Sequence, residues 1–328
     1  METSKEQILL VGYGLKLLGD TRIRTGRICR TDKGYKELRK LNCDEKRALF
    51  MHNAKEHLFK NGFGSISRFV VATDGLPYYK TEEAIYVLED YQETDYIDLT
   101  NEENLIRSIR LMAKFHNASE GFVAEDGFYN YGKMIEQFEK RNRELNRIKK
   151  WIDRQSSKSS VDLIVMNNMN YYKDRAEVSK HMTNKDVYNK VISDDKNKKC
   201  FCHNNFKSET IMVKDGGDLL LTGFEKCAYD CTVVDLAEFF RRYLKEPFAK
   251  IDMIYKMLEE YSKIRSISEY ELQVLKGMIV FPKKFFKLCN QYYNKRRVFV
   301  SDAMLQKFQN CIEETKKNKD LLNTLVLK

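Results

Sequence analysis

The sequence has no apolar run long enough to cross a lipid bilayer, which takes about 20 consecutive residues in a helix. The first residues, METSKEQILLVGYGL, also lack the basic segment and the long apolar segment of a secretory signal peptide. These absences argue against a membrane protein. They predict synthesis in the cytoplasm without a signal peptide, and no membrane among the partners.

Cysteine is too sparse for a disulfide scaffold, with eight residues in a chain of 328. Five potential metal ligands do lie close together in sequence: Cys200, Cys202, His203, Cys227 and Cys231. A zinc site is one interpretation, but the C-x-C and C-x-x-x-C spacings differ from those of common zinc modules. We therefore expect buried, reduced thiols and no metal. The chain also shows no internal repeat and no low-complexity linker.

The composition indicates a folded globular protein, because 42% of the residues are hydrophobic and 12% are aromatic. The formal net charge is +10, from 58 Lys and Arg against 48 Asp and Glu. Because both signs are spread along the whole chain, we interpret the excess as a solvated basic surface. Nucleic acid is the alternative partner, and steeply salt-dependent DNA binding would support it.

The stretch 199–243 carries the most specific pattern. A short apolar strand leads into a polar loop at His203, and a hairpin follows with its turn at 215–217. A strand at Leu219–Leu221, a second polar loop and an amphipathic helix from Val233 complete the stretch. Kinase-like phosphotransferases place a catalytic Asp, a metal-binding Asn and a metal-binding Asp on such a layout.

This segment is similar to the aminoglycoside/choline kinase-like family, whose pattern is H-G-D-x-x-x-x-N, a hairpin, I-D-F/W-D/E and D-L-A. The similarity is greatest to the CotS-type spore coat branch. Two parts of the family pattern are kept. The F/W-D/E pair is Phe224-Glu225, and the D-L-A run is Asp235-Leu236-Ala237. The family's His, catalytic Asp, metal-binding Asn and metal-binding Asp fall on His203, Asn205, Thr210 and Gly223. The scaffold is therefore present, and the three chemical positions after the His are changed.

These changes remove the groups that phosphoryl transfer needs. The amide of Asn205 cannot act as a general base, a role that typically contributes a factor of roughly 100 to 10,000. Magnesium prefers carboxylates, whereas Thr210 offers a hydroxyl and Gly223 offers no side chain. We interpret the chain as a pseudokinase. The alternative is an atypical small-molecule or protein kinase that uses Glu209 or Glu225 in place of the missing carboxylates.

The resemblance continues into the N-terminal part. The family strand G-K-Y-x-L-K matches residues 34–40, with Arg39 at the phosphate-binding Lys and Lys40 after it. The helix Glu that pairs with this Lys in kinases falls on Asn53, with Glu56 one turn away as a substitute. Three residues fall on the linker whose backbone pairs with adenine in relatives: Glu89, Asp90 and Tyr91. A remnant nucleotide site is expected at these positions.

The predicted fold is α+β, a two-lobed protein-kinase-like (aminoglycoside phosphotransferase-like) fold. A small β-rich lobe would span 1–91 and a larger helical lobe 92–328. Hydrophobic periodicity and turn signals predict strands at 67–72, 77–80 and 84–91, after a hairpin at 23–41. Helices are expected at 4–18, 44–60, 102–117, 130–154, 161–182, 248–263, 268–280, 282–295 and 302–318, besides the one from Val233. A polar loop is expected at 193–199.

The resemblance to CotS-type proteins implies a place in the spore coat of an endospore-forming bacterium. The implied partners are other spore coat proteins, and self-association as a homo-oligomer stays open. No cofactor is expected under the pseudokinase interpretation. ATP and magnesium are expected only if the atypical-kinase alternative holds.

Overall fold

The computed structural model describes residues 5–294 and 301–327. They form two compact units, one of residues up to Phe128 with Lys199–Tyr229, and one of Tyr129–Lys198 with the residues from Asp230 onward. This division differs from the predicted lobes, 1–91 and 92–328. Residues 92–128 and 199–229 belong to the first unit, because the aromatic core around Phe115 holds them together.

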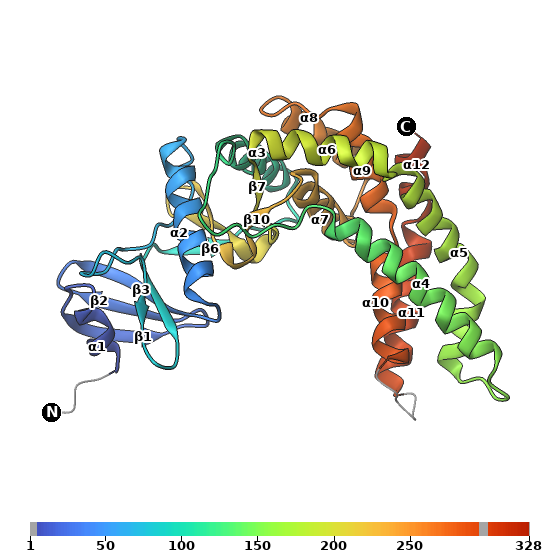
Figure 1. The fold of residues 1–328 in the computed structure, drawn as a ribbon, viewed down its shortest axis with the longest axis horizontal. Coiled ribbons are helices and arrows are strands. Elements are labelled where there is room, and N and C mark those ends of the chain that lie inside the picture. Colours follow the sequence, from blue (N-terminus) through green and yellow to red (C-terminus); the bar gives the residue numbers. More distant parts are fainter. Residues whose placement is uncertain (1–4, 295–300, 328) are drawn as a thin grey trace. The chain divides into compact units, whose positions relative to one another are not determined.

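A five-stranded antiparallel sheet forms the N-terminal part of the first unit (Figure 1). Its order is β1-β2-β3-β5-β4, with the bounds β1 Leu17–Arg22, β2 Arg27–Thr31, β3 Gly34–Leu41, β5 Ile85–Asp90 and β4 Tyr79–Lys80. The predicted hairpin is confirmed, and Gly34 turns the chain between β2 and β3 with φ +90°. Only glycine adopts that backbone region without strain.

The sequence misjudged two segments near this sheet. Helix α1 covers only Lys5–Val11 of the predicted 4–18, and residue 4 lies outside the described residues. The turn at Gly14, with φ +64°, follows the end of the helix, and Leu17 and Leu18 after it belong to β1. Residues 67–72 form no named strand. They contact β5 through a single bridge between Phe69 and Glu89.

Two helices and two small sheets complete the first unit. They are α2 (Glu45–Lys60), α3 (Glu102–Ala118), the sheet of β6 (Thr94–Tyr96), β8 (Ile211–Lys214) and β9 (Leu219–Leu221), and the pair of β7 (Phe201–Cys202) and β10 (Ala228–Tyr229). The side chain of Asp44 caps α2, accepting from the Arg47 amide at 2.9 Å. The predicted β8–β9 hairpin is confirmed, and Gly217 in its turn has φ +83°.

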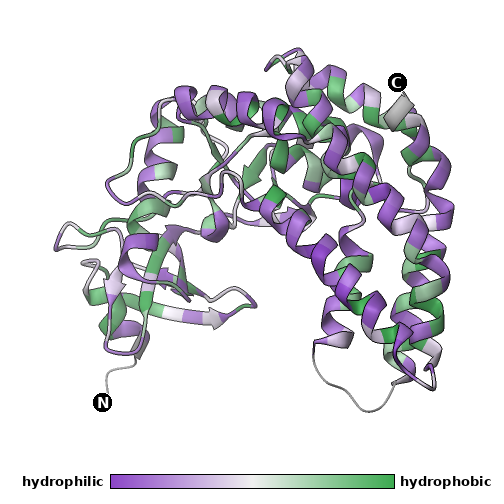
Figure 2. Cartoon of the chain, turned by 45° about the vertical axis from the view of Figure 1, so that its right-hand side comes forward, coloured by the Kyte–Doolittle hydropathy of each residue, from purple (hydrophilic) through white to green (hydrophobic). Residues whose placement is uncertain are grey.

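The second unit is helical (Figure 1). Its helices are α4 (Lys133–Asp153), α5 (Ser160–Met182), α6 (Lys185–Lys198), α7 (Val233–Tyr243), α8 (Ile251–Ser262), α9 (Glu269–Val280), α10 (Lys283–Tyr293), α11 (Asp302–Lys317) and α12 (Lys319–Leu327). The apolar faces of α4, α5, α10 and α11 form one core that includes Val165, Phe285 and Phe308. Figure 2 shows hydrophilic and hydrophobic residues on the same helices, as expected for amphipathic packing.

Two details of this unit differ from the sequence prediction. Helix α6 includes most of the segment 193–199 predicted as a loop, because Tyr188, Val191 and Asp195 form a buried face on it. The sequence also gave no sign of α12. Residue 295, at the end of one predicted helix, lies outside the described residues.

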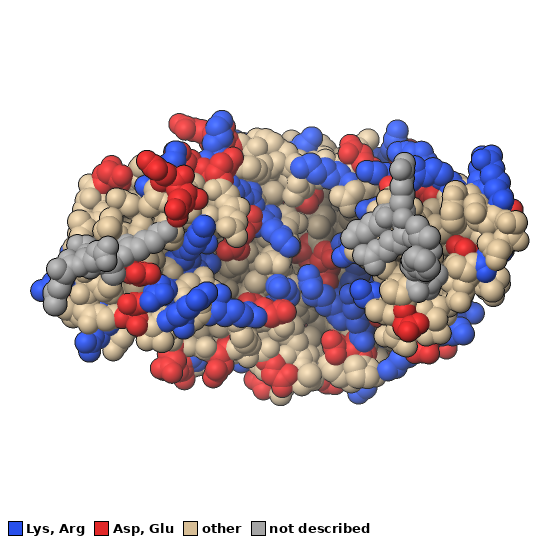
Figure 3. Space-filling model, turned by 90° about the horizontal axis from the view of Figure 1, so that it is seen from below, with Lys and Arg blue, Asp and Glu red and all other residues tan. Residues whose placement is uncertain are grey.

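The surface agrees with the composition. Among the described residues, no helix combines the length and the apolar character needed to span a membrane. Figure 3 shows basic and acidic side chains interspersed over the face that it draws.

Cys200, Cys202, Cys227 and Cys231 are buried and form no disulfide.

Candidate functional site: a kinase-like loop without its carboxylates

His203 follows β7 and is a packing residue. It is fully buried, and its Nε2 lies 2.9 Å from the carbonyl oxygen of Thr222. Its ring packs edge-on against Phe224, with centroids 4.9 Å apart. Through these contacts His203 ties the loop after β7 to the segment after β9. The loop residues that follow are therefore held beside Gly223.

The structure brings together the three changed positions of the kinase pattern. Thr210, at the end of the short 3-10 turn Ser208–Thr210, is 5% exposed. Its hydroxyl donates within the loop, to the carbonyl of Asn205 at 2.8 Å or of Lys207 at 3.0 Å. A Cβ placed on Gly223 would lie 2.7 Å from Cγ2 of Thr210 and 3.3 Å from Nδ2 of Asn205. The three residues therefore fill one small volume.

This packing leaves no room for a metal-binding Asp at position 223. A contact of 2.7 Å between carbon atoms is well inside the optimal separation of about 3.5–4.0 Å. The hydrogen-bonded, buried Thr210 side chain cannot rotate away freely. Gly223 also has φ +78° and ψ 45°, a left-handed conformation that costs other residues roughly 1–2 kcal/mol. An Asp at this position would need changes at both Thr210 and the backbone.

The two acids that could replace the missing carboxylates differ in their surroundings. Glu209 is exposed, with its carboxylate 3.2 Å from the hydroxyl of Ser208 and 3.7 Å from Nζ of Lys207. The side chain of Glu225 is 45% exposed, and its Oε1 accepts from Nη1 of Arg39 at 3.3 Å. The Arg47 guanidinium also holds the backbone carbonyl of Glu225.

Arg39, at the position of the phosphate-binding Lys, is neutralised by acids of the chain itself. From β3 its Nη2 donates to Glu89 on β5 at 3.0 Å, and its Nη1 reaches Glu225. Burial alone would lower the pKa of Arg39, but Glu89 and Glu225 raise it above its usual value. A phosphate group at this guanidinium would therefore compete with two carboxylates.

A second cation reaches the same carboxylate from α2. Lys55 is 2% exposed and donates to Oε1 of Glu89, and its Nζ lies 4.1 Å from the centroid of the Phe69 ring. Burial would raise the pKa of Glu89, but Arg39 and Lys55 together hold it below its usual value. The central acid of this cluster thus lies on the strand, and the helix supplies a cation. This is the reverse of the charge order in kinases, where the strand Lys pairs with a helix Glu.

The sequence alignment did not single out Lys55. Asn53, expected at this point of the helix, is exposed, and its substitute Glu56 pairs bidentately with Arg68 at 2.7 and 2.6 Å. A signal was present, because Lys55 continues the apolar stripe of Met51 and Leu58 at helical spacing. A Lys on such a stripe calls for a buried acidic partner.

The remaining predicted positions lie at the edge of this region. Lys40 is exposed on β3. Asp90 pairs with Lys36, and the backbone amide of Tyr91 donates to the carbonyl of Tyr35 at 3.1 Å. Glu89, Asp90 and Tyr91 therefore continue the pairing of β5 with β3.

The fold matches solved phosphotransferase structures over nearly the full chain. An aminoglycoside phosphotransferase from Alicyclobacillus acidocaldarius superposes with a TM-score of 0.84 at 17% identity, covering 97% of this chain and 94% of that one. Spectinomycin phosphotransferase APH(9)-Ia, solved with ADP and spectinomycin, gives 0.62 at 11% identity over 95% of each chain. Amicoumacin kinase hAmiN gives 0.55 at 10% identity over 98% and 89%. The chain therefore has the kinase-like aminoglycoside phosphotransferase fold, as predicted.

The sequence family narrows this class. Residues 6–325 match the family described as "Spore coat putative kinase YutH", and this chain belongs to that family. The family match and the fold confirm the resemblance to spore coat proteins of the kinase-like class. They do not bear on catalysis, because fold and function are separable.

Proposed function

We propose that this chain is a spore coat pseudokinase, a structural or assembly component of the coat in which phosphoryl transfer has been lost. The packing of Thr210 against Gly223 is the observation that carries the proposal. Enzymes of this class hold magnesium through an Asn and an Asp at these two positions. In this chain the same volume is filled by a threonine methyl group.

The charges around Arg39 support the same conclusion. Glu89 engages both Arg39 and Lys55, and Glu225 engages Arg39 from the other side. To bind a triphosphate, Arg39 would have to give up these ion pairs, and the cost of breaking them reduces the binding free energy that it can contribute. Because magnesium ligands and a free cation would both be needed, we expect no magnesium-dependent ATP turnover.

Thermal unfolding with ATP, with and without magnesium, tests the proposal. A ligand at about 100 times its dissociation constant stabilises a protein by roughly 2.7 kcal/mol. We expect no magnesium-dependent rise in melting temperature and no ADP formation. Magnesium-dependent ADP formation that exceeds the background of a mock purification would refute the proposal.

A back-substituted protein provides the matched control. The triple variant Asn205→Asp, Thr210→Asn and Gly223→Asp restores the family's three groups and removes the Thr210 methyl at the same time. If this variant gains a magnesium-dependent shift with ATP while the unmodified chain has none, the three positions account for the loss.

An atypical kinase is the second candidate, and the partial exposure of Glu225 beside the changed positions is the observation that favours it. It predicts magnesium-dependent ATP consumption that Glu225→Gln or Glu209→Gln abolishes. Turnover that survives both substitutions would exclude this rescue.

The family implies deposition in the spore coat, with other coat proteins as partners. A fluorescent fusion in a sporulating host should form a shell around the spore, and the triple variant should do the same if assembly needs no chemistry. Diffuse fluorescence in the mother cell would count against an assembly role. Light scattering of the purified chain tests self-association as a homo-oligomer.

A further inference from the structure

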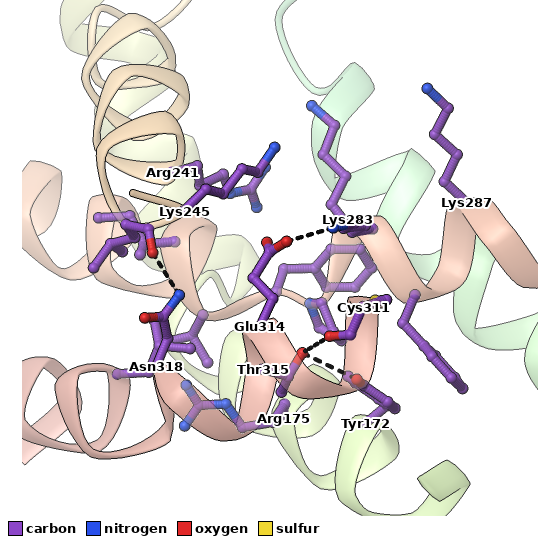
Figure 4. Close-up of a pocket in the computed structure, with 18 of the residues that line it drawn as sticks. Tyr172, Arg175, Arg241, Lys245, Lys283, Lys287, Cys311, Glu314, Thr315 and Asn318 are labelled. Carbon is purple, nitrogen blue, oxygen red and sulfur yellow. Dashed lines mark hydrogen bonds and ion pairs between the residues drawn. The ribbon is translucent and has the colours of Figure 1, made fainter. Parts of the chain in front are cut away.

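The helical second unit contains a pocket of about 420 Å³ (Figure 4). Its walls come from α5, the C-terminal end of α7 and the residues after it, the end of α9, α10, α11 and the start of α12. Every lining residue belongs to the second unit, so none of the changed kinase positions contributes to it. The volume lies within the usual range of ligand sites, roughly 300–1,000 Å³.

The lining of this pocket is strongly basic. Seven of its residues are Lys or Arg, and two are Glu. Glu238 accepts from Arg241 at 2.9 Å and from Lys283 at 2.7 Å, and Glu314 pairs with Lys284. Both acids are therefore already engaged.

Four cations are left without a carboxylate partner among the described residues. They are Arg175, Arg242, Lys245 and Lys287. Figure 4 shows Arg241 and Lys245 on one side of the pocket, at the end of α7, and Lys283 and Lys287 on the other, on α10. Cations from α5, α7 and α10 thus line one volume, and an anion bound between them would reduce their mutual repulsion.

The guanidinium of Arg175 is buried and only partly hydrogen-bonded. It is 8% exposed; Nη1 donates to Oδ1 of Asn323 at 3.0 Å, and Nη2 is buried with no hydrogen-bond partner in the described part of the chain. Nε of Arg241 is likewise buried with no hydrogen-bond partner in the described part of the chain. Burial lowers the pKa of the Arg175 guanidinium, because no neighbouring carboxylate offsets its desolvation. Buried guanidinium groups left with unused donors are costly and point to an absent ligand.

The pocket also has an aromatic wall. The rings of Tyr172 and Phe285 stack with centroids 3.7 Å apart, and the Tyr172 hydroxyl donates to Thr315 at 3.0 Å. These contacts hold this wall of the pocket in place. A rigid wall with preformed charges lowers the entropy lost on binding.

We propose that this pocket binds a small multivalent anion that carries phosphate or carboxylate groups. The net positive lining calls for more than one negative charge. The three arginines of the lining supply planar donors suited to either group. The limited volume favours a small molecule over a segment of a macromolecule.

Calorimetric titration of the full chain tests this proposal, with inorganic pyrophosphate in one arm and citrate in the other at constant ionic strength. We expect saturable binding of at least one of them. Binding of pyrophosphate alone identifies a phosphate ligand, and binding of citrate alone identifies a carboxylate ligand. If neither binds, the proposal is wrong.

Charge-matched variants separate the pocket from the general basic surface. The double variant Lys245→Gln/Lys287→Gln removes two exposed, unpaired cations of the lining and should weaken binding about tenfold or more. The control Lys149→Gln/Lys150→Gln removes the same charge from exposed positions on α4 and should bind as the unmodified chain does. Equal weakening in both variants would overturn the proposal.

Arg175→Gln tests the buried cation, with circular dichroism to confirm the fold.

ATP is itself a multivalent anion, so it could bind here without any kinase chemistry. A magnesium-independent shift with ATP that Lys245→Gln/Lys287→Gln abolishes would report this pocket. Magnesium-dependent ADP formation would instead refute the pseudokinase proposal, so the two failures are distinguishable.

Discussion

Lys55 on α2 and Glu89 on β5 form an ion pair in which the side chains are only 3% and 5% exposed. The pair joins the helix to the sheet, and Arg39 extends it toward Glu225 on the segment after β9. Arg39, at the position of the phosphate-binding Lys, thus contacts two carboxylates of the chain itself. The ion cluster has become part of the core of the first unit.

Lys55→Met should destabilise the protein strongly. Breaking a buried ion pair by removing one partner typically costs 3–5 kcal/mol, and we expect the lower end because Arg39 still pairs with Glu89. The double variant Lys55→Met/Glu89→Gln should lose less than the sum of the single variants. Urea unfolding measures all three. Strictly additive losses would mean that the two side chains do not act as a pair.

Gly223→Ala should be more costly than a glycine substitution elsewhere with similar backbone geometry. At Gly34, with φ +90° and nothing within 4 Å of an added Cβ, we expect about 1–2 kcal/mol from the backbone alone. At Gly223 the contact with Thr210 adds an overpacking cost of about 1–3 kcal/mol.

The same contact predicts a rescue. Thr210→Ser removes Cγ2 and keeps the hydroxyl, so Gly223→Ala should cost less in a Thr210→Ser background. Thermal unfolding of the four proteins gives the coupling. Equal costs of Gly223→Ala in both backgrounds would show that the methyl group is not the obstacle.

The sequence was informative where side-chain patterns have one structural meaning. The hairpin at 23–41 and the hairpin with its turn at 215–217 were both predicted, because Gly34 and Gly217 supply the positive φ that such turns require. The changed positions Asn205, Thr210 and Gly223 were identified from the family pattern. Their mutual packing could not be predicted, because it depends on the exact approach of two loops.

Most of the features that could not be predicted from the sequence depend on contacts between residues far apart in the chain. The choice of Glu89 as partner of Lys55 depends on strand register, and no local pattern encodes it. The basic pocket was equally invisible, since Arg175 and Lys287 lie more than a hundred residues apart. In sequence their charges looked like part of a generally solvated surface.

The thiols give a simple test of the fold. Seven of the eight cysteines are buried and Cys43 is partly exposed, all in the reduced form. Ellman's reagent should titrate one thiol in the folded protein and eight after denaturation. Burial raises the pKa of Cys43, so its reaction should speed up as the pH rises. The single reactive thiol should vanish in Cys43→Ser. Two or more accessible thiols in the native protein would contradict the described packing.

Two buried carboxylates of the second unit should make stability depend on pH. Burial raises the pKa of Asp230 to about 7, and Asp235 and Asp195 add to the rise. Burial raises the pKa of Asp195 to about 6, although Thr232 and Arg265 oppose it. An unfolded Asp titrates near 3.9, so between about pH 4 and pH 7 the native state holds more protons than the unfolded state. The free energy of unfolding contributed by these groups therefore falls as pH rises through this window.

Asp230→Asn should flatten this slope and stabilise the protein at pH 8 relative to the unmodified chain. The amide oxygen can still accept from the Cys231 backbone amide, which Asp230 engages at 2.9 Å, and it carries no charge to desolvate. One titrating group contributes at most about 1.4 kcal/mol per pH unit. Urea unfolding from pH 4 to pH 8 measures the slope. Asp194→Asn, at an exposed position on α6, removes a charge that stays in water and should retain the slope. Asp195 should leave a smaller slope in Asp230→Asn. A slope as steep as that of the unmodified chain would mean that Asp230 is ionised throughout, and its burial would then have to be offset by a partner.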